Sequence, residues 1–169
     1  MDLKDISYLG IVDSSGRVLY EINYCNVNVM ELMKNRHVPI SIYKDKPLFI
    51  ETKISNKGHG DLHFILLAEQ HSNEIFVYEA FQSLLEIFDK FMKNGWHLER
   101  FETKYDMFIL AINEFVFNGI ILEDNKEKLT ERLQKRSFES IGGIKVNKGL
   151  ASMLNKAAKS MKNSFSLKK

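Results

Sequence analysis

Apolar residues recur at helical spacing in two long stretches near the middle of the chain. The first runs from about Asn73 to Lys93 and the second from about Leu98 to Asn118, with Gly95 in the short loop between them. Apolar side chains three or four residues apart share one face of a helix with about 3.6 residues per turn, so both stretches predict amphipathic helices. Asn73 is a suitable N-cap for the first helix, and Gly119 is the expected left-handed C-cap of the second.

Shorter apolar runs, separated by brief polar loops, predict an antiparallel sheet ahead of these helices. Loops this short join antiparallel neighbours, because a parallel pair needs a long crossover. Asn23 to Asn35 predicts a short helix, Asn125 to Arg136 a longer one with an Asp124–Glu127 capping box, and Lys148 to Ser166 a final amphipathic helix. Strands followed by helices indicate an α+β fold with helices packed on a sheet. The predicted strands are Ile6 to Val12, Arg17 to Ile22, Pro39 to Tyr43, Leu48 to Ile54 and Leu62 to Ala68.

The composition is that of an ordinary globular protein. With 169 residues, of which 44% are hydrophobic and 27% charged, the chain is long enough for one core and too apolar to be disordered. A net charge of +2 does not favour nucleic-acid binding. No apolar run is long enough to cross a membrane, and the first residues lack the apolar region of a secretory signal, so we expect neither feature.

Charge is nevertheless unevenly distributed along the chain. From Lys145 to the end there are seven lysines and no carboxylate, which leaves the remainder with a net charge of −5. We therefore expect residues 1–145 to form one domain and residues 146–169 a basic amphipathic helix. Lys156, Lys159 and Lys162 flank its apolar stripe and are candidate contacts to an acidic partner groove or an anionic membrane surface. The alternative is that this helix packs on the domain with its lysines in water.

The residue types that carry out catalysis or bind metals form no recognisable site. His59 and His63 are four residues apart across a Gly-rich turn, which favours solvated loop histidines over metal ligands. Cys25 is the only cysteine, and a buried or half-buried thiol is a simpler expectation than a nucleophile. Gly142 and Gly143 lack the spacing of a phosphate-binding loop and favour a flexible linker. We therefore expect no enzyme, no cofactor and no metal.

The first long helix is apolar beyond the stripe that faces its core. A helix that is apolar over most of its circumference is covered on more than one side. Another helix of this chain or a partner protein could provide that cover. Trp96, between the two long helices, is either an aromatic lid over the core or a partner contact. The candidate partner interface consists of Ile75, Phe76, Tyr78, Ala80, Ile87 and Trp96.

The segment from Phe108 to Glu123, FILAINEFVFNGIILE, resembles a motif of the small subunits of vesicle coats. In the zeta subunits of coatomer, the COPI coat, this motif reads approximately FLAVDEIVDGGVILE, and the sigma chains of clathrin adaptors carry a looser version. The opening hairpin, the last strand and the first long helix match the family in order. Asn113 stands where the family has Asp, and Phe117–Asn118 where it has Asp-Gly. Gly119 to Glu123 and the extension after Gly149 resemble zeta more than sigma.

The resemblance implies a longin-like fold, in which a five-stranded antiparallel sheet has helices on both faces and, in zeta, an added C-terminal helix. It implies a structural coat subunit without catalytic residues. Zeta binds the large gamma subunit within a heterotetramer that an Arf-family GTPase recruits to Golgi membranes. The expected location is therefore the cytoplasm and the cytoplasmic face of Golgi membranes and COPI vesicles. The expected process is retrograde Golgi-to-ER and intra-Golgi transport.

Three alternatives differ from this interpretation. A clathrin-adaptor sigma chain would have the same fold in another coat. A longin-type membrane-fusion protein (SNARE) would continue into a heptad-bearing motif and an anchor, neither of which is recognisable here, and a small α+β enzyme would need a catalytic constellation. Sigma chains help bind dileucine sorting signals, and Arg100 places a charge where their pocket is apolar, so we expect no dileucine binding. The positions that align with that pocket are Leu62, Leu85, Asn94, Gly95 and Arg100.

Overall fold

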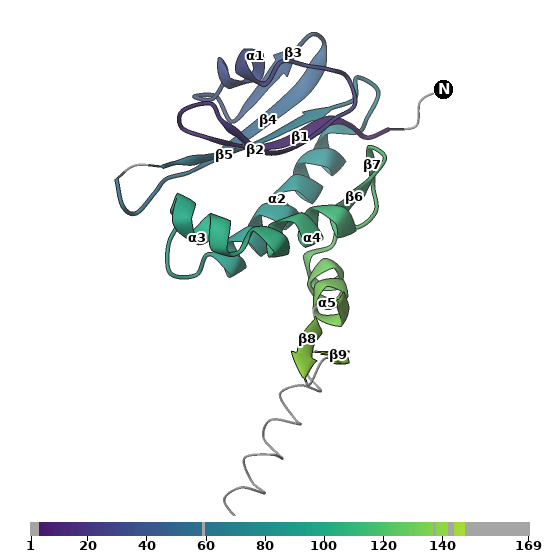
Figure 1. Cartoon of the computed structure of the whole chain (residues 1–169). Helices are drawn as coiled ribbons and strands as arrows, with labels where there is room; N and C mark the ends of the chain where they lie inside the picture. The colour runs from purple at the N-terminus through teal and green to yellow at the C-terminus, as the bar shows by residue number, and fades with distance from the viewer. Residues whose placement is uncertain (1–3, 59, 137, 142–143, 148–169) are drawn as a thin grey trace, which may run out of the picture. The chain divides into compact units, whose positions relative to one another are not determined.

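A computed structural model of the chain describes residues 4–58, 60–136, 138–141 and 144–147 (Figure 1). The chain divides into two compact units after Leu129. The first unit contains a five-stranded antiparallel sheet in the order β2-β1-β5-β4-β3. This arrangement confirms the predicted α+β class and the five predicted strands. The strands are β1 (Ile6–Asp13), β2 (Val18–Asn23), β3 (Ile40–Tyr43), β4 (Lys46–Lys53) and β5 (Leu62–Ala68).

The two central strands, β1 and β5, are buried along their whole length. Their nearly continuous apolar sequences suit this position, because both faces of the sheet are covered. The β3–β4 hairpin turns at Lys44 and Asp45, whose φ angles of 48° and 62° are those of a two-residue type I′ turn. β2 and β3 come first and last in the strand order, so they are the two edges of the sheet.

Helices cover the two faces of the sheet unequally (Figure 1). The short α1 (Val29–Met33) covers one face, and α2 (Glu74–Phe91), α3 (Leu98–Thr103) and α4 (Tyr105–Phe115) lie on the other. Aromatic rings fill the second face, where Phe88 lies 5.4 Å from Phe64 and 4.6 Å from Phe108 between ring centroids. The core beneath α1 contains Tyr8, Val12, Leu32, Met33, Leu48, Ile50, Ile65 and Leu67.

The start of α2 agrees with the sequence prediction. The Asn73 side-chain oxygen accepts hydrogen bonds from the N–H groups of Ile75 and Phe76, both at 3.1 Å, which fixes the first turn of the helix. The short first helix is confirmed over a narrower range than predicted. Asn28 caps it by accepting from the Met30 N–H at 2.9 Å, so the residues from Asn23 to Val27 stay outside the helix.

The second long helix was predicted as one element, and this prediction is wrong. The structure has α3 and α4 meeting at Lys104, whose N–H bonds back to the carbonyls of Arg100 and Phe101. α4 ends at Phe115 and is followed by a small hairpin of β6 (Val116–Phe117) and β7 (Ile120–Ile121). β-branched and aromatic residues favour strand over helix there.

Gly119 has the predicted left-handed backbone, with φ of 81°, but its position is a hairpin turn and not a helix C-cap. Asn118, at φ 50°, completes the turn, and the Gly119 carbonyl accepts from the N–H groups of Asp5 and Ile6 at 2.8 and 3.0 Å. The predicted Asp124–Glu127 capping box is also wrong. Asn125 caps α5 (Lys126–Arg136), because its side-chain oxygen accepts from the Lys128 N–H at 3.0 Å.

Beyond α5 the chain contains a strand pair that the sequence did not predict. β8 (Phe138–Ile141) pairs antiparallel with β9 (Ile144–Asn147), where we expected only a Gly-rich linker. The domain boundary predicted after residue 145 falls inside β9. The predicted helix from Lys148 to Ser166, with Lys156, Lys159 and Lys162, lies outside the described residues.

Candidate protein-binding surface

The residues predicted to form a partner interface on α2 divide into exposed and buried groups. Ile75 is 72% exposed, and Phe76 and Tyr78 are half-buried. Ala80 and Ile87 are 0% and 1% exposed, so their place in the interface is corrected. α2 packs against both β5 and α4, and this second contact accounts for part of the apolar excess that the sequence left unexplained.

The exposed part of α2 lies beside the β3 edge of the sheet. Tyr78 packs on Phe49 of β4 with ring centroids 5.4 Å apart, and the Lys53 ammonium lies 3.1 Å from the Asp89 carboxylate near the other end of α2. These two contacts show that α2 runs along β4 in the same direction. Ile75, one turn before Tyr78, therefore lies toward the β3–β4 turn.

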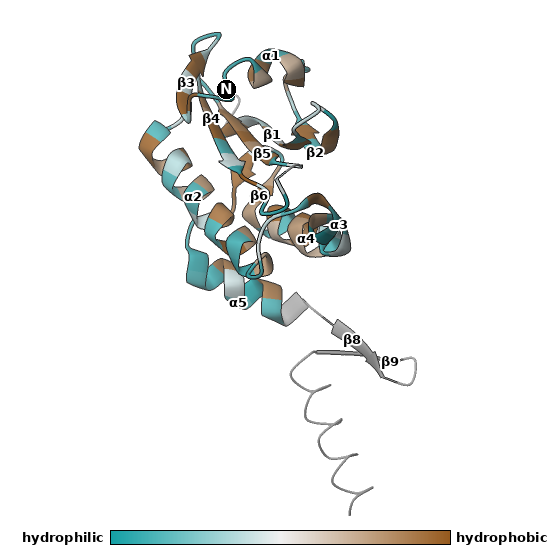
Figure 2. Ribbon diagram, turned by 90° about the vertical axis from the view of Figure 1, so that its left-hand side faces the viewer, coloured by the Kyte–Doolittle hydropathy of each residue, from teal (hydrophilic) through white to brown (hydrophobic). Residues whose placement is uncertain are grey.

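Two isoleucines of β3 extend this apolar area. Ile40 and Ile42 are 53% and 74% exposed. Ile40 pairs with Phe49 in the sheet, so both isoleucines lie on the face that carries α2. We define the β3–α2 surface as Ile40, Ile42, Ile75 and Tyr78. Hydropathy colouring shows apolar residues on β3 and at the start of α2 (Figure 2).

A shallow groove borders the β3–α2 surface at Tyr78. It lies between the β3–β4 hairpin and α2 and is lined mainly by Pro39, Phe49, Tyr78, Phe81 and Gln82. The sequence did not indicate Ile40 and Ile42, because their alternation with Ser41 reads as an ordinary inward-facing strand. The informative signal was the short length of the predicted strand, which is typical of a sheet edge.

Trp96 is held in place by the chain itself. Its indole N–H donates to the Asp89 carboxylate at 3.0 Å, and its ring packs edge-on against Phe64 and Phe108 at 5.4 and 6.1 Å. The Lys53 ammonium lies 5.8 Å from the ring centroid. Trp96 is therefore a lid on the aromatic core, and a partner contact by its half-buried ring stays a prediction.

The positions that align with a dileucine pocket do not form an open apolar site. Leu62 and Leu85 are 0% and 2% exposed. Gly95 has φ of 101°, and the Asn56 side chain occupies the space that a Cβ there would need. A nearby cavity of about 160 Å³ has a charged rim, where Lys57 and Glu99 form an ion pair at 2.7 Å. The absence of dileucine binding stays a prediction that this geometry favours.

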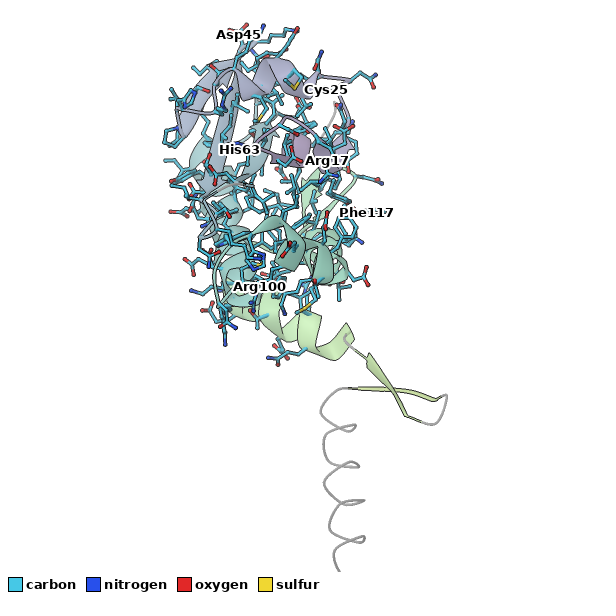
Figure 3. The ribbon with its side chains drawn as sticks, turned by 60° about the vertical axis from the view of Figure 1, so that its left-hand side comes forward. Arg17, Cys25, Asp45, His63, Arg100 and Phe117 are labelled. Atoms are coloured by element: carbon cyan, nitrogen blue, oxygen red, sulfur yellow. The ribbon has the colours of Figure 1, made fainter. Side chains whose placement is uncertain are left out.

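The candidate chemical groups occupy unexpected environments. His63 is buried and not solvated as predicted, with its Nδ1 atom 2.9 Å from the Thr52 hydroxyl. Burial lowers the pKa of His63 below its ordinary value, although the nearby Asp61 carboxylate acts in the opposite direction. Cys25 was expected to be at least half-buried but is exposed at the periphery (Figure 3). His59 lies outside the described residues.

Within the part of the chain that the structure describes, no three His, Cys, Asp or Glu side chains converge as a metal site would require. Among the same residues, no helix combines the length and apolar character that a membrane span needs. The β3–α2 surface is thus one of the exposed apolar areas of the first unit, and such areas are typical of protein-binding sites.

Residues 11–139 match the protein family described as clathrin adaptor complex small chain. The chain belongs to this family. The small chain is therefore a coat-complex subunit of vesicle trafficking, and the family is one of structural subunits. This confirms the resemblance found in the sequence motif that ends at Glu123.

Individual relatives narrow the comparison. The small chain is 30% identical over 166 residues to a coatomer subunit zeta of Encephalitozoon cuniculi, covering 95% of this chain and 96% of the relative. It is 28% identical over 88 residues to a coatomer subunit zeta of Saccharomyces cerevisiae, covering 52% of this chain and 47% of the relative. A chain in a homology model of the full-length AP-3 complex in a stretched open conformation is similar with a TM-score of 0.47 and 13% identity, covering 94% and 98% of the two chains.

Proposed function

We propose that this small chain is the zeta-type subunit of the COPI coat and that it binds the large gamma subunit of coatomer. The observation that carries the proposal is the 30% identity to a coatomer subunit zeta over 95% of this chain and 96% of that relative. The zeta-like sequence from Gly119 to Glu123 supports the same assignment. The chain acts as a structural subunit without catalytic activity and serves retrograde Golgi-to-ER and intra-Golgi transport.

The β3–α2 surface supports binding to a large subunit. Exposed large apolar side chains that lie together at the surface of a small domain mark a site covered by another protein. Membrane association follows from the assembled coat, which an Arf-family GTPase recruits to the cytoplasmic face of Golgi membranes. Recruitment by the assembled coat does not depend on a membrane contact by the small chain, although such a contact would add to it.

Co-expression with large coat subunits tests this function. The small chain is expressed with a gamma-type subunit or with the corresponding large subunit of a clathrin adaptor, and co-purification is measured under matched conditions. Stable co-purification with gamma alone supports the zeta assignment. Co-purification with the adaptor subunit alone would assign the chain to a sigma role and overturn the proposal.

The basic segment from residue 146 to 169 is a second, separable contact. Its lysines suit an anionic surface, because each positive charge adds electrostatic attraction to the membrane. The full chain is compared with the triple variant Lys156→Ala, Lys159→Ala and Lys162→Ala in co-sedimentation with vesicles containing anionic lipid. Equal pelleting of the two proteins would show that these lysines make no membrane contact. The assignment to the coat would not be affected.

A further inference from the structure

We propose that the outer edge of β3 is a strand-addition site, at which the large coat subunit contributes an extended apolar segment flanked by acidic residues. This inference rests on the proposed function, because it names how the partner is held. Three independent features of β3 support it: its hydrogen-bonding register, its exposed side chains and the charges at its two ends.

The register of the β3–β4 hairpin determines which backbone groups face outward. The Pro39 carbonyl accepts a hydrogen bond from the Ile50 N–H at 2.9 Å, so Pro39 and Ile50 form a hydrogen-bonded pair. Such pairs alternate along an antiparallel ladder, which assigns the next two to Ser41 and Tyr43 of β3. The N–H and carbonyl groups of Ile40 and Ile42 therefore point away from β4.

These four outward groups have no strand beside them among the described residues, where β3 pairs with β4 alone. An unpaired strand edge is a template for another extended chain, since only a strand can satisfy all of its donors and acceptors at once. A helix resting on the edge would cover the isoleucine side chains but leave the backbone groups without partners.

The side chains beside this edge specify an apolar incoming segment. Ile40 and Ile42 are 53% and 74% exposed on the α2 face of the sheet. An added strand places every second side chain on that face, next to the isoleucines and within reach of Ile75 and Tyr78. The incoming segment therefore carries apolar residues at alternate positions.

Charge identifies the flanks of the partner segment and disfavours a second copy of this chain. Residues 34–45 contain Lys34, Arg36 and Lys44 but only one carboxylate, that of Asp45, and the Glu31 carboxylate of α1 lies 3.8 Å from the Lys44 ammonium. Lys34 and Arg36 precede β3 and Lys44 follows it, and all three are exposed. Carboxylates at both ends of an incoming strand would pair with these cations. Two copies of β3 paired edge to edge would instead bring like charges together, which destabilises the pairing.

A proline substitution at Ile42 tests the strand edge, because it removes an outward backbone donor together with the isoleucine side chain. Ile42→Pro removes an outward N–H while leaving the β3–β4 hydrogen bonds in place, because proline is tolerated on the free side of an edge strand. We expect binding to the gamma subunit to weaken about tenfold or more, since the partner loses a hydrogen bond and Ile42 packing. Ile42→Val keeps both features and should bind within about twofold of the unchanged chain.

A matched control lies on the opposite edge of the sheet. By the same alternation, Glu21 of β2 has its backbone groups pointing outward, because it faces Gly10 in a non-hydrogen-bonded pair. Glu21→Pro should leave binding unchanged while carrying the same type of backbone change. Urea unfolding of all variants confirms that each is folded, and backbone hydrogen exchange provides a second readout. The Ile40 and Ile42 amides should exchange about tenfold or more slowly in the complex than in the free chain.

The outcomes distinguish the two proposals. If the unchanged chain binds gamma but Ile42→Pro binds equally well and the two amides remain unprotected, strand addition is overturned and the coat function stands. If the unchanged chain binds no gamma subunit, both proposals fail. A dimer of this chain that Ile42→Pro dissolves would assign the edge to a second copy and also overturn the inference.

Discussion

The two edge strands of the sheet differ in how well they are protected from pairing with another strand. At β2 the Tyr105 hydroxyl donates to the Leu19 carbonyl at 3.2 Å, the register shifts at a bulge opposite Ile11, and Glu21 places a charge on the edge. Such features prevent unwanted strand pairing. At β3 the edge carries Ile40 and Ile42, both exposed. The chain therefore protects the β2 edge with its own residues and leaves the isoleucines of the β3 edge exposed.

Helix placement explains this difference better than strand sequence. The N-terminal part of α4 lies beside β2 and supplies Tyr105, and α3 brings Glu102 to within 3.8 Å of the Arg17 guanidinium. At β3, α1 brings the Glu31 carboxylate to the Tyr43 hydroxyl and to within 3.8 Å of the Lys44 ammonium, and among the described residues the strand pairs with β4 alone. Phe117 is also 63% exposed, and Figure 3 places it on the same side of the view as Arg17. The β6–β7 hairpin is nonetheless attached to the segment before β1, because the Asp5 carboxylate accepts a hydrogen bond from the Ile121 N–H at 2.8 Å.

The largest expected effect comes from placing charge on the open edge. Ile42→Asp combined with Ile75→Asp should weaken gamma binding by about a hundredfold, because both side chains would be desolvated against an apolar partner. Co-purification and a binding titration measure this. Val18→Asp on β2 is the matched control and should bind like the unchanged chain. A comparable loss with Val18→Asp would show that the two edges do not differ in function.

The turn that leads into β2 should contribute more to stability than the turn beyond β3. The Asp13 carboxylate accepts from the Ser15 and Arg17 N–H groups at 2.9 and 3.0 Å and from the Ser15 hydroxyl at 2.6 Å. Asp13→Asn should lower the free energy of unfolding by about 1–3 kcal/mol, because it weakens charge-assisted hydrogen bonds. Asp45→Asn, in the left-handed β3–β4 turn, should change it by less than about 0.5 kcal/mol, since Asn tolerates that conformation. Equal losses in urea unfolding would contradict this ranking.

Removing a hydrogen bond that protects the β2 edge should have a smaller effect on the free energy of unfolding than Asp13→Asn. Tyr105→Phe removes the hydroxyl that donates to the Leu19 carbonyl and should cost about 1 kcal/mol of unfolding free energy. It should also leave β2 more prone to self-association, which sedimentation or light scattering detects. Tyr20→Phe, a half-buried tyrosine on the same strand, should fall within about 0.5 kcal/mol of the unchanged chain. If the two variants behave alike, the hydroxyl does not protect this edge.

Acid should loosen the β4–β5 pair around His63 before the turn between β1 and β2, which contains Asp13. The pKa of buried His63 lies below 6.5, so its contribution to stability is complete above pH 6.5 and is lost as pH falls through the folded-state value. For Asp13, burial acts to raise the pKa, but hydrogen bonds from Ser15 and Arg17 together lower it below 3.8. Its contribution is therefore complete above pH 3.8 and is lost as pH falls through that lower value.

Hydrogen exchange followed against pH measures this order. Amides of β4 and β5 around Thr52 and His63 should lose protection at a higher pH than those of the β1–β2 hairpin. His63→Asn removes the group that titrates and should flatten the pH dependence between about pH 7 and 5. Simultaneous loss of protection in both regions would show that neither group acts locally.

Sequence patterning alone was sufficient for the elements whose signals are local. The five strands, the start of α2 at Asn73 and the left-handed backbone of Gly119 follow from alternation, capping chemistry and glycine geometry. The family motif was readable for the same reason, because it is a contiguous segment. The break at Lys104 was missed, since the apolar stripe continues through it and periodicity does not detect a local change in backbone direction.

Which apolar residues remain exposed depended on contacts between distant segments. Ile75 and Ile87 look alike on the helix, yet one is 72% exposed and the other 1%. Likewise, the order β2-β1-β5-β4-β3 makes β3 an edge, although its sequence is that of an ordinary strand. Local sequence determined where the helices and strands form. Burial and edge position are set by neighbours that only the folded chain brings together, so the tertiary structure decided which apolar side chains stay exposed.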